Sequence, residues 1–346
     1  MKNESREEIL EALGGRFGDR IKPYPPDATP GPLASVWPGG PDDVRYLLAL
    51  AHEYGVPITP RGTGLEAEGD LPGSIVVRFD LMRQIHIPEG GEDWAEAEPG
   101  ALWLALDNEL RLLGRGLAVY PTSAPRATVG GWLATDGIGV GSFLYGRLRQ
   151  NVPLVSVVMP GGELREMPGE RLGERDVRSG IIVKARLRTR RAGSDVPFAV
   201  SFGSAPRALG AAAAALEGRV PLWHLALINQ RMAEARELGG DYLLFGAYAA
   251  PSEAVEEWLA ALPGSYGGRV LGAAEAHRVW GERFFPVAPS FPTPKAVREF
   301  VPLPHLAETL PRREPFPYQV TFSRSGEALL LSLQERNLSK NRARYA

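Results

Sequence analysis

Two glycine-rich stretches of the chain offer groups that could hold an anion or a flat ligand. The first, residues 60–65, reads Pro-Arg-Gly-Thr-Gly-Leu and directly follows a short apolar segment. Its two glycines allow successive backbone N–H groups to converge on an anion such as a diphosphate. For so short a motif an ordinary glycine turn is the alternative. The loop has no P-loop lysine and no G-x-G-x-x-G pattern, so it predicts neither nucleoside-triphosphate hydrolysis nor a Rossmann site.

The second stretch covers residues 121–141 and is followed by Tyr145 and Gly146. It holds five glycines and four serine or threonine hydroxyls. Regular structure does not account for so many small residues and free amides, whereas a flat ligand lying against main chain does. A solvent-exposed loop is the alternative. The apolar side chains of Val129, Trp132 and Leu133 favour burial, and with it a cofactor site.

Single side chains further along the chain could act on a substrate. His224, His277 and His305 could each take a proton from a substrate hydroxyl, because imidazole titrates near neutrality. Arg283 and Arg298 could each hold a carboxylate through two parallel hydrogen bonds. For each of these residues a structural or surface role is the competing interpretation.

The pattern of the chain predicts an α+β fold that would position these residues. A helix is expected from Pro41 to Gly55, and short strands are expected on both sides of the first loop, at residues 56–59 and 74–80. A second helix over residues 102–113 precedes the second stretch. Strands at 154–159 and 181–187 follow it, and a plainer α+β half begins after Gly193.

Composition excludes several classes of function. The 346 residues contain no cysteine, which rules out disulfides, thiolate nucleophiles and cysteine-bound metal clusters in this chain. Any redox chemistry must therefore come from an organic cofactor. A net charge of -2 without a basic block predicts no nucleic-acid partner. The charged N-terminus and the lack of a long apolar run predict a cytoplasmic protein without a membrane span.

Taken in order, these motifs resemble the FAD-binding domain of the vanillyl-alcohol-oxidase superfamily. The matches are P-x-G-x-G at 60–64, P-x-S…A-T-x-G-G-x-x-A-T at 121–135, Y-G…N-V at 145–152 and a Gly-Gly turn at 161–162. The resemblance is to the branch of glycolate oxidase and D-lactate dehydrogenase. It implies a PCMH-type FAD-binding domain of two α+β subdomains at residues 1–195, followed by a smaller α+β substrate or cap domain at residues 196–346.

The resemblance also implies site residues. No histidine stands in the diphosphate loop, so FAD is expected to bind non-covalently. Arg283 follows Trp280 in a W-x-x-R element, and the turn that supplies histidines in this branch reads Thr321 to Leu330 here without one, so no metal site is expected. The expected catalytic residues are His277, Arg283 and His305. The expected cofactor-binding residues are Arg61, Gly62, Thr63, Gly64, Leu65, Pro121, Thr122, Thr128, Gly130, Gly131, Ala134, Thr135, Gly137, Tyr145, Gly146, Ile182 and Val183.

Three functional hypotheses follow. The first is an FAD-dependent oxidoreductase that oxidises a small 2-hydroxy acid by hydride transfer to flavin N5. The second is a non-catalytic or electron-relaying FAD-binding subunit of a multi-subunit glycolate oxidase, working beside a second flavin subunit and an iron–sulfur subunit. The third is a relative that no longer binds flavin, because the segment before Gly180 is short.

Overall fold

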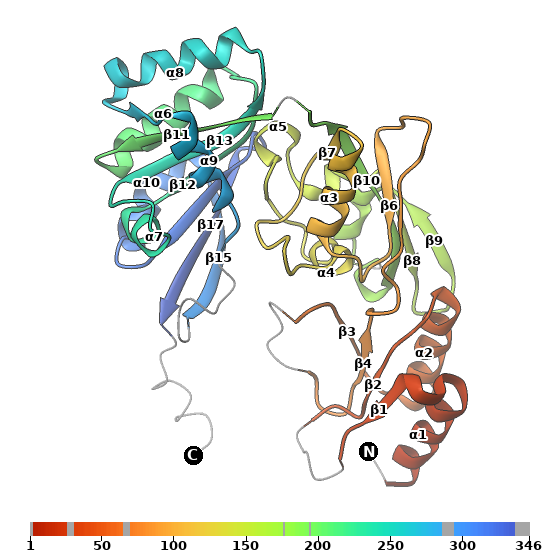
Figure 1. Cartoon of the computed structure of the whole chain (residues 1–346). Coiled ribbons are helices and arrows are strands. Elements are labelled where there is room, and N and C mark those ends of the chain that lie inside the picture. Colours follow the sequence, from red (N-terminus) through yellow and green to blue (C-terminus); the bar gives the residue numbers. More distant parts are fainter. Residues whose placement is uncertain are drawn as a thin grey trace, which may run out of the picture. The chain divides into compact units, whose positions relative to one another are not determined.

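The fold consists of two compact units through which the chain passes more than once (Figure 1). A computed structural model describes residues 3–25, 31–64, 70–175, 177–193, 195–285 and 294–335. The N-terminal unit contains Met1–Ala118, Ala124–Asp136 and Leu148–Arg190. The C-terminal unit contains Val119–Ser123, Gly137–Arg147 and Arg191–Ala346.

A four-stranded sheet forms the first part of the N-terminal unit. Its helix α2 (Pro41–Tyr54) begins with proline and ends at Gly55, whose φ of 63° and N–H bonds to the last turn give a glycine C-cap. The apolar face of α2 and helix α1 (Asn3–Phe17) share one core with the strands. Strands β2, β4 and β3 run parallel, and β1 pairs antiparallel with β2. The order is β1 (Ile21–Pro23), β2 (Ala34–Val36), β4 (Ile75–Arg78) and β3 (Ile58–Arg61).

A six-stranded sheet forms the second part of the same unit. Its longest strand, β10 (Ile181–Arg191), alternates between buried and more exposed residues over most of its length, as a strand covered on one face requires. Helix α3 (Trp103–Leu112) and the short helix α4 (Val129–Leu133) belong to this unit. The other strands are β5 (Ile85–His86), β6 (Trp94–Ala97), β7 (Arg115–Leu117), β8 (Leu154–Val158) and β9 (Leu164–Met167).

The C-terminal unit is built on a seven-stranded antiparallel sheet. The order is β14 (Arg269–Val270), β11 (Asp195–Phe202), β13 (Tyr242–Ala249), β12 (Leu222–Ile228), β16 (Tyr318–Phe322), β17 (Glu327–Glu335) and β15 (Pro294–Pro302). The helices are α5 (Ser142–Tyr145), α6 (Ala205–Glu217), α7 (Gln230–Ala235), α8 (Glu253–Tyr266), α9 (Ala273–Gly281) and α10 (Leu306–Thr309).

Both faces of this sheet are buried, but under different helices (Figure 1). Alternate strand residues such as Val200 and Leu244 pack with α6 and α8, while their neighbours Ala199 and Phe245 pack with α7 and α9. We call the side under α7 and α9 the α9 face and the opposite side the α6 face. Because the side chains of a strand alternate, β16 sends Gln319 and Thr321 to the α9 face and Tyr318 to the α6 face.

The fold class expected from the sequence is confirmed, since both units combine helices and sheets and the first contains two α+β parts. The helices expected after Pro41 and over residues 102–113 form with boundaries close to those expected. The domain limits at residues 195 and 196 stay a prediction.

Candidate functional site

The first glycine-rich loop leaves the C-terminal end of β3 and lies against the start of α4. Gly64 has a φ of 79°, a conformation that favours glycine. A Cβ on Gly62 would collide with the side-chain oxygen of Thr128. Thr63 Oγ1 donates a hydrogen bond to the carbonyl of Arg126 at 2.7 Å. The two stretches singled out in the sequence therefore touch each other in the N-terminal unit.

The start of α4 is shaped by close backbone packing. Thr128 is the N-cap, and its Oγ1 accepts a hydrogen bond from the N–H of Gly131 at 3.3 Å. A Cβ on Gly130 would lie 2.6 Å from Cβ of Pro99, so only glycine allows this approach. Thr135 Oγ1, just after Ala134 at the end of this helix, donates to the carbonyl of Trp132.

A cavity of about 420 Å³ opens beside these loops. Asp70 lies 2.8 Å from the Arg61 guanidinium, so an acidic side chain already balances that charge. A phosphate would therefore rely on the loop amides more than on Arg61. The cavity is lined by Arg61, Gly62, Thr63, Phe79, Asp80, Arg83, Ile85, Gly100, Ala101, Leu102, Ala105, Glu109 and Thr128.

Three other expected cofactor residues lie around or outside this region. Ile182 is half-buried, and Val183 is buried in the core that contains α2. The pairing of β10 with β8 shifts register between Ile182 and Lys184, which marks a β-bulge at this point. Leu65 lies outside the described residues.

The remaining expected cofactor residues fold with the C-terminal unit. Segments 119–123 and 137–147 are joined by two backbone hydrogen bonds between Tyr120 and Val140. Gly139 packs so closely on the Tyr120 carbonyl that no Cβ would fit. These segments carry Pro121, Thr122, Gly137, Tyr145 and Gly146, of which Gly146 has a φ of 76°.

Arg283 lies directly beside the first of these segments. Its Nε donates to Tyr120 Oη at 3.1 Å, and the N–H of Phe285 donates to the Thr122 carbonyl at 3.1 Å. The guanidinium stacks on the rings of Trp280 and Phe284, at 4.7 Å and 4.2 Å from the ring centroids. Within the described residues no carboxylate is ion-paired with Arg283.

A second arginine and a glutamine hold the backbone on which Arg283 stands. Arg236 Nη2 donates to the Phe284 carbonyl and to Gln319 Oε1, both at 3.0 Å. Gln319 Nε2 in turn donates to the Arg283 carbonyl at 3.2 Å. Burial lowers the pKa of Arg236 to about 10, while the negative charge of Glu282 opposes that shift. These hydrogen bonds hold the segment that follows α9 in place.

His224 lies on β12 on the same sheet face. It is fully buried, and neither ring nitrogen has a hydrogen-bond partner. Its ring centroid is 5.7 Å from that of Trp280 and 6.2 Å from that of Phe245. Burial, helped by the charge of Arg283, lowers the pKa of His224 to about 3. Leaving a buried polar group unpaired costs about 1–3 kcal/mol, so such an arrangement needs a reason.

The structure does not bring the other two candidate histidines into this cluster. His277 is exposed on α9, and its Nδ1 bonds to the Ala273 carbonyl at 2.9 Å. His305 is exposed beside α10. Of the two arginines considered for a carboxylate, Arg298 is exposed on β15 and stacks on Phe300. Sequence alone offered no means of ranking these residues, because burial and contact decide between them.

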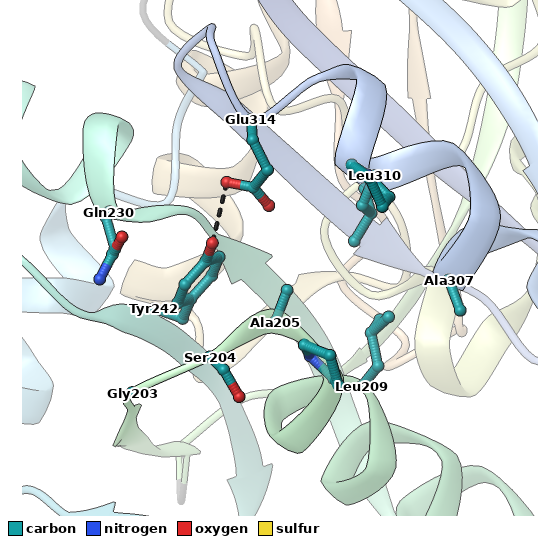
Figure 2. Close-up of a pocket in the computed structure, with 11 residues that line it drawn as sticks. Gly203, Ser204, Ala205, Leu209, Gln230, Tyr242, Ala307, Leu310 and Glu314 are labelled. Atoms are coloured by element: carbon teal, nitrogen blue, oxygen red, sulfur yellow. Dashed lines mark hydrogen bonds between the residues drawn. The ribbon is translucent and has the colours of Figure 1, made fainter.

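The α6 face carries a separate pocket of about 300 Å³ at the start of α6 (Figure 2). Tyr242 Oη donates to one oxygen of Glu314, and Tyr318 Oη donates to the other, each at 2.8 Å. Burial and this carboxylate raise the pKa of Tyr242 to about 12. The residues that line this pocket include Glu314 and no basic residue, so the pocket suits an anionic ligand poorly.

Comparison with known proteins identifies the N-terminal part. Residues 32–168 match the family model described as an FAD binding domain. An uncharacterised FAD-linked oxidoreductase of Mycobacterium tuberculosis is 32% identical over 136 residues, which cover 38% of this chain and 29% of that protein. The glycolate oxidase subunit GlcD of Bacillus subtilis is 29% identical over 154 residues, covering 42% of this chain and 33% of that protein. The chain thus spans about a third of either relative.

A solved structure extends the likeness in fold to almost the whole chain. The 4-ethylphenol oxidase from Gulosibacter chungangensis, in complex with isoeugenol, superposes with a TM-score of 0.77. The match covers 96% of this chain and 83% of that one at 16% identity. Residues 32–168 therefore match an FAD binding domain, as predicted, and the chain shares the fold of this oxidase. Its sequence likeness extends to the glycolate oxidase branch.

The site residues fit an FAD. The cavity beside the first loop is bordered by main chain and small side chains at Gly62, Thr63, Gly100, Ala101 and Thr128, which leaves room for a ligand to approach the backbone. Within the described ranges, no helix has the length and apolar character needed to cross a bilayer.

Proposed function

We propose that this chain is an FAD-dependent oxidoreductase that converts a small 2-hydroxy acid to the 2-oxo acid. The observation that carries the proposal is the position of Arg283: a half-buried guanidinium without an ion-pair partner among the described residues, hydrogen-bonded to Tyr120 and adjoining Thr122. Thr122 is one of the residues expected to line the flavin. A carboxylate bound by Arg283 would place its neighbouring carbon beside that segment.

The roles of the residues follow from their chemistry. The amides of residues 61–64 and the start of α4, which includes Thr128 and Gly131, would hold FAD. When bound, FAD supplies a two-electron acceptor for the hydrogen at C2 of the substrate. No histidine stands among residues 61–64, which supports non-covalent binding. Arg283 would orient the carboxylate, and Trp280 and Phe284 would exclude water from the guanidinium. His277 and His305 stay candidates for the base on sequence grounds alone.

Anaerobic titration tests the proposal. The purified protein should be yellow, and glycolate, D-lactate or a related 2-hydroxy acid should bleach its flavin absorbance without oxygen. A yellow protein that no such acid bleaches would contradict the oxidoreductase assignment. A colourless protein that takes up no added FAD would contradict flavin binding altogether.

The second candidate is an FAD-binding subunit of a larger glycolate oxidase, with another flavin subunit and an iron–sulfur subunit as partners. It is supported by the β16–β17 hairpin, whose tip carries Ser323 and Ser325, hydrogen-bonded to each other, and no histidine. The likeness to a protein named as a glycolate oxidase subunit also supports it. Co-purification of a second flavoprotein, with bleaching seen only in the complex, would favour this alternative.

A further inference from the structure

The α9 face of the C-terminal sheet collects buried polar atoms that have no partner. Thr321 on β16 pairs with Ala226 on β12, and His224 is two residues along β12 on the same side. Diagonal neighbours in such a pair lie roughly 7–8 Å apart. His224 and Thr321 are both fully buried, and both imidazole nitrogens and Thr321 Oγ1 lack hydrogen-bond partners. A fourth unpaired atom is Nη1 of Arg236, whose Nη2 bonds to the Phe284 carbonyl and to Gln319.

Two cations accompany these unpaired atoms. The indole of Trp280 contacts the His224 ring and also carries the Arg283 guanidinium, so the two groups are neighbours across one partly exposed side chain. Arg283, Arg236 and Tyr120 lie beside this cluster, and Glu282 acts on Arg236 through its charge. The other charged or titratable groups on α7 and α9 are exposed: Arg231, Glu234, Glu275, His277 and Arg278. Among the described residues neither Arg283 nor Arg236 is ion-paired with a carboxylate. An anionic ligand with a hydroxyl group could pair with an arginine and also donate a hydrogen bond to one of the unpaired atoms.

We propose that His224 is the proton acceptor of this site, acting on a 2-hydroxy carboxylate whose carboxylate group is bound by Arg283. The inference rests on the proposed function. The O–H bond at C2 breaks and its proton passes to a nitrogen of His224. The C2–H bond breaks with its electron pair passing to the bound FAD, the oxidant. The C2–O bond becomes a double bond, the 2-oxo acid remains on Arg283, and His224 later releases its proton to water.

The surroundings of His224 explain why its proton affinity rises when a carboxylate binds to Arg283. Burial and the charge of Arg283 keep the imidazole neutral, so its nitrogen is free to accept a proton. A carboxylate on Arg283 offsets that positive charge and raises the proton affinity of His224. Substrate binding thus strengthens the base that acts on the same substrate. The histidine stands on β12, which pairs with β16 of the β16–β17 hairpin.

Rapid kinetics with the FAD-loaded protein tests the role of His224. The variant is His224→Gln, with His224→Asn as a second form, and the matched control is His52→Gln at an exposed site in the last turn of α2. With the acid that bleaches the wild type, the His224 variants should reduce roughly 10²- to 10⁴-fold more slowly. They should keep their FAD content and a cooperative melting transition, and His52→Gln should react within about twofold of wild type. Reduction by His224→Gln at the wild-type rate overturns the proposal.

Calorimetry with oxalate, a dicarboxylate without a C2 hydrogen, gives a readout that does not need turnover. Titrations at pH 6 in two buffers of different ionisation enthalpy should show that the wild type takes up a fraction of a proton on binding. His224→Gln should bind oxalate within about fivefold of wild type without that uptake. Undiminished uptake in the variant, or no binding to the wild type, overturns the inference. If no 2-hydroxy acid bleaches the wild type, the proposed function fails, while the loss or persistence of proton uptake still decides the role of His224.

Discussion

The two units present the groups that we propose as ligand-binding in different ways. In the N-terminal unit the groups are backbone amides. Their loops pack closely because Gly62 and Gly130 have no side chain that would collide with Thr128 or Pro99. In the C-terminal unit they are side chains, with Arg283 and His224 brought together on one face of a sheet. The contrast suits the two ligands we propose. A large cofactor is held along main chain, whereas a small acid needs a few charged groups at fixed positions.

Removing the guanidinium of Arg283 should give the largest effect on the binding of an acid. Arg283→Met should weaken binding of a 2-hydroxy acid or oxalate by at least about 2 kcal/mol, because a bound carboxylate loses its charged partner. That is roughly thirtyfold in apparent affinity. Flavin absorbance per protein should stay unchanged, because in our proposal backbone amides of the N-terminal unit hold the cofactor.

The control for this variant is Arg298→Met, which alters an exposed arginine on β15. Steady-state kinetics and oxalate titration should leave it close to wild type. Equal losses in the two variants would show that general surface charge, and not Arg283, attracts the acid.

Adding a methyl group at Gly62, in the first glycine-rich loop, should give the next largest effect, a loss of FAD affinity. In Gly62→Ala the new Cβ displaces Thr128 Oγ1 from its cap on Gly131. Overpacking of this kind costs about 1–3 kcal/mol, so FAD should bind roughly 5- to 150-fold more weakly. Fluorescence titration of the apoprotein with FAD measures this loss of affinity. Gly161→Ala, where nothing lies within 4 Å, should bind FAD normally. Full FAD affinity in Gly62→Ala would remove this loop from the cofactor site.

The buried imidazole should make stability depend on pH. The folded pKa of His224, about 3, lies below its ordinary 6.5, so protonation favours the unfolded chain. The stabilisation is therefore complete above about pH 6.5 and is lost as the pH falls toward 3. Between pH 6.5 and 5.5 the wild type should lose about 1 kcal/mol that His224→Gln does not lose. Urea unfolding at both pH values measures the difference, and identical pH slopes would mean that His224 is not buried as a neutral ring.

The α6 face should give the smallest effect on function. Tyr242→Phe removes a hydrogen bond to Glu314 and should cost about 1 kcal/mol of stability. FAD content and flavin reduction should not change, because Tyr242 lies on the sheet face opposite His224. Slower flavin reduction in Tyr242→Phe would mean that the pocket of Figure 2 takes part in the reaction after all.

The sequence predicts a region well when the residues that shape it stand close together in the chain, and poorly when they are far apart. Residues 61–64 and 128–131 form short motifs in which glycine spacing predicts the backbone, and the structure brings these two loops together. The cluster around Arg283 had no such signal, because Tyr120 lies 163 positions away in the chain and meets it only after both segments fold onto the sheet. His224 could be named as a candidate, but its burial without partners required the structure.

Elements missed by pattern share a second cause. β17 contains the run Ala328 to Leu331, which is buried on both faces and therefore has neither the alternation of a half-exposed strand nor a helical period. β2 has only three residues, all buried, and follows a stretch rich in proline. Long amphipathic elements such as α2 keep a period that can be read directly.

The path of the chain limits how the protein can be divided. It passes between the two units at five points, and α5 contributes Phe143, fully buried, to the core under α6 and α8. A fragment starting at residue 191 would leave that ring's place empty, which typically costs about 3–5 kcal/mol. A chimera between relatives that exchanges the C-terminal half must therefore carry residues 119–123 and 137–147 from the same parent. In this fold the unit of recombination is a set of interleaved segments, and a single cut point does not define it.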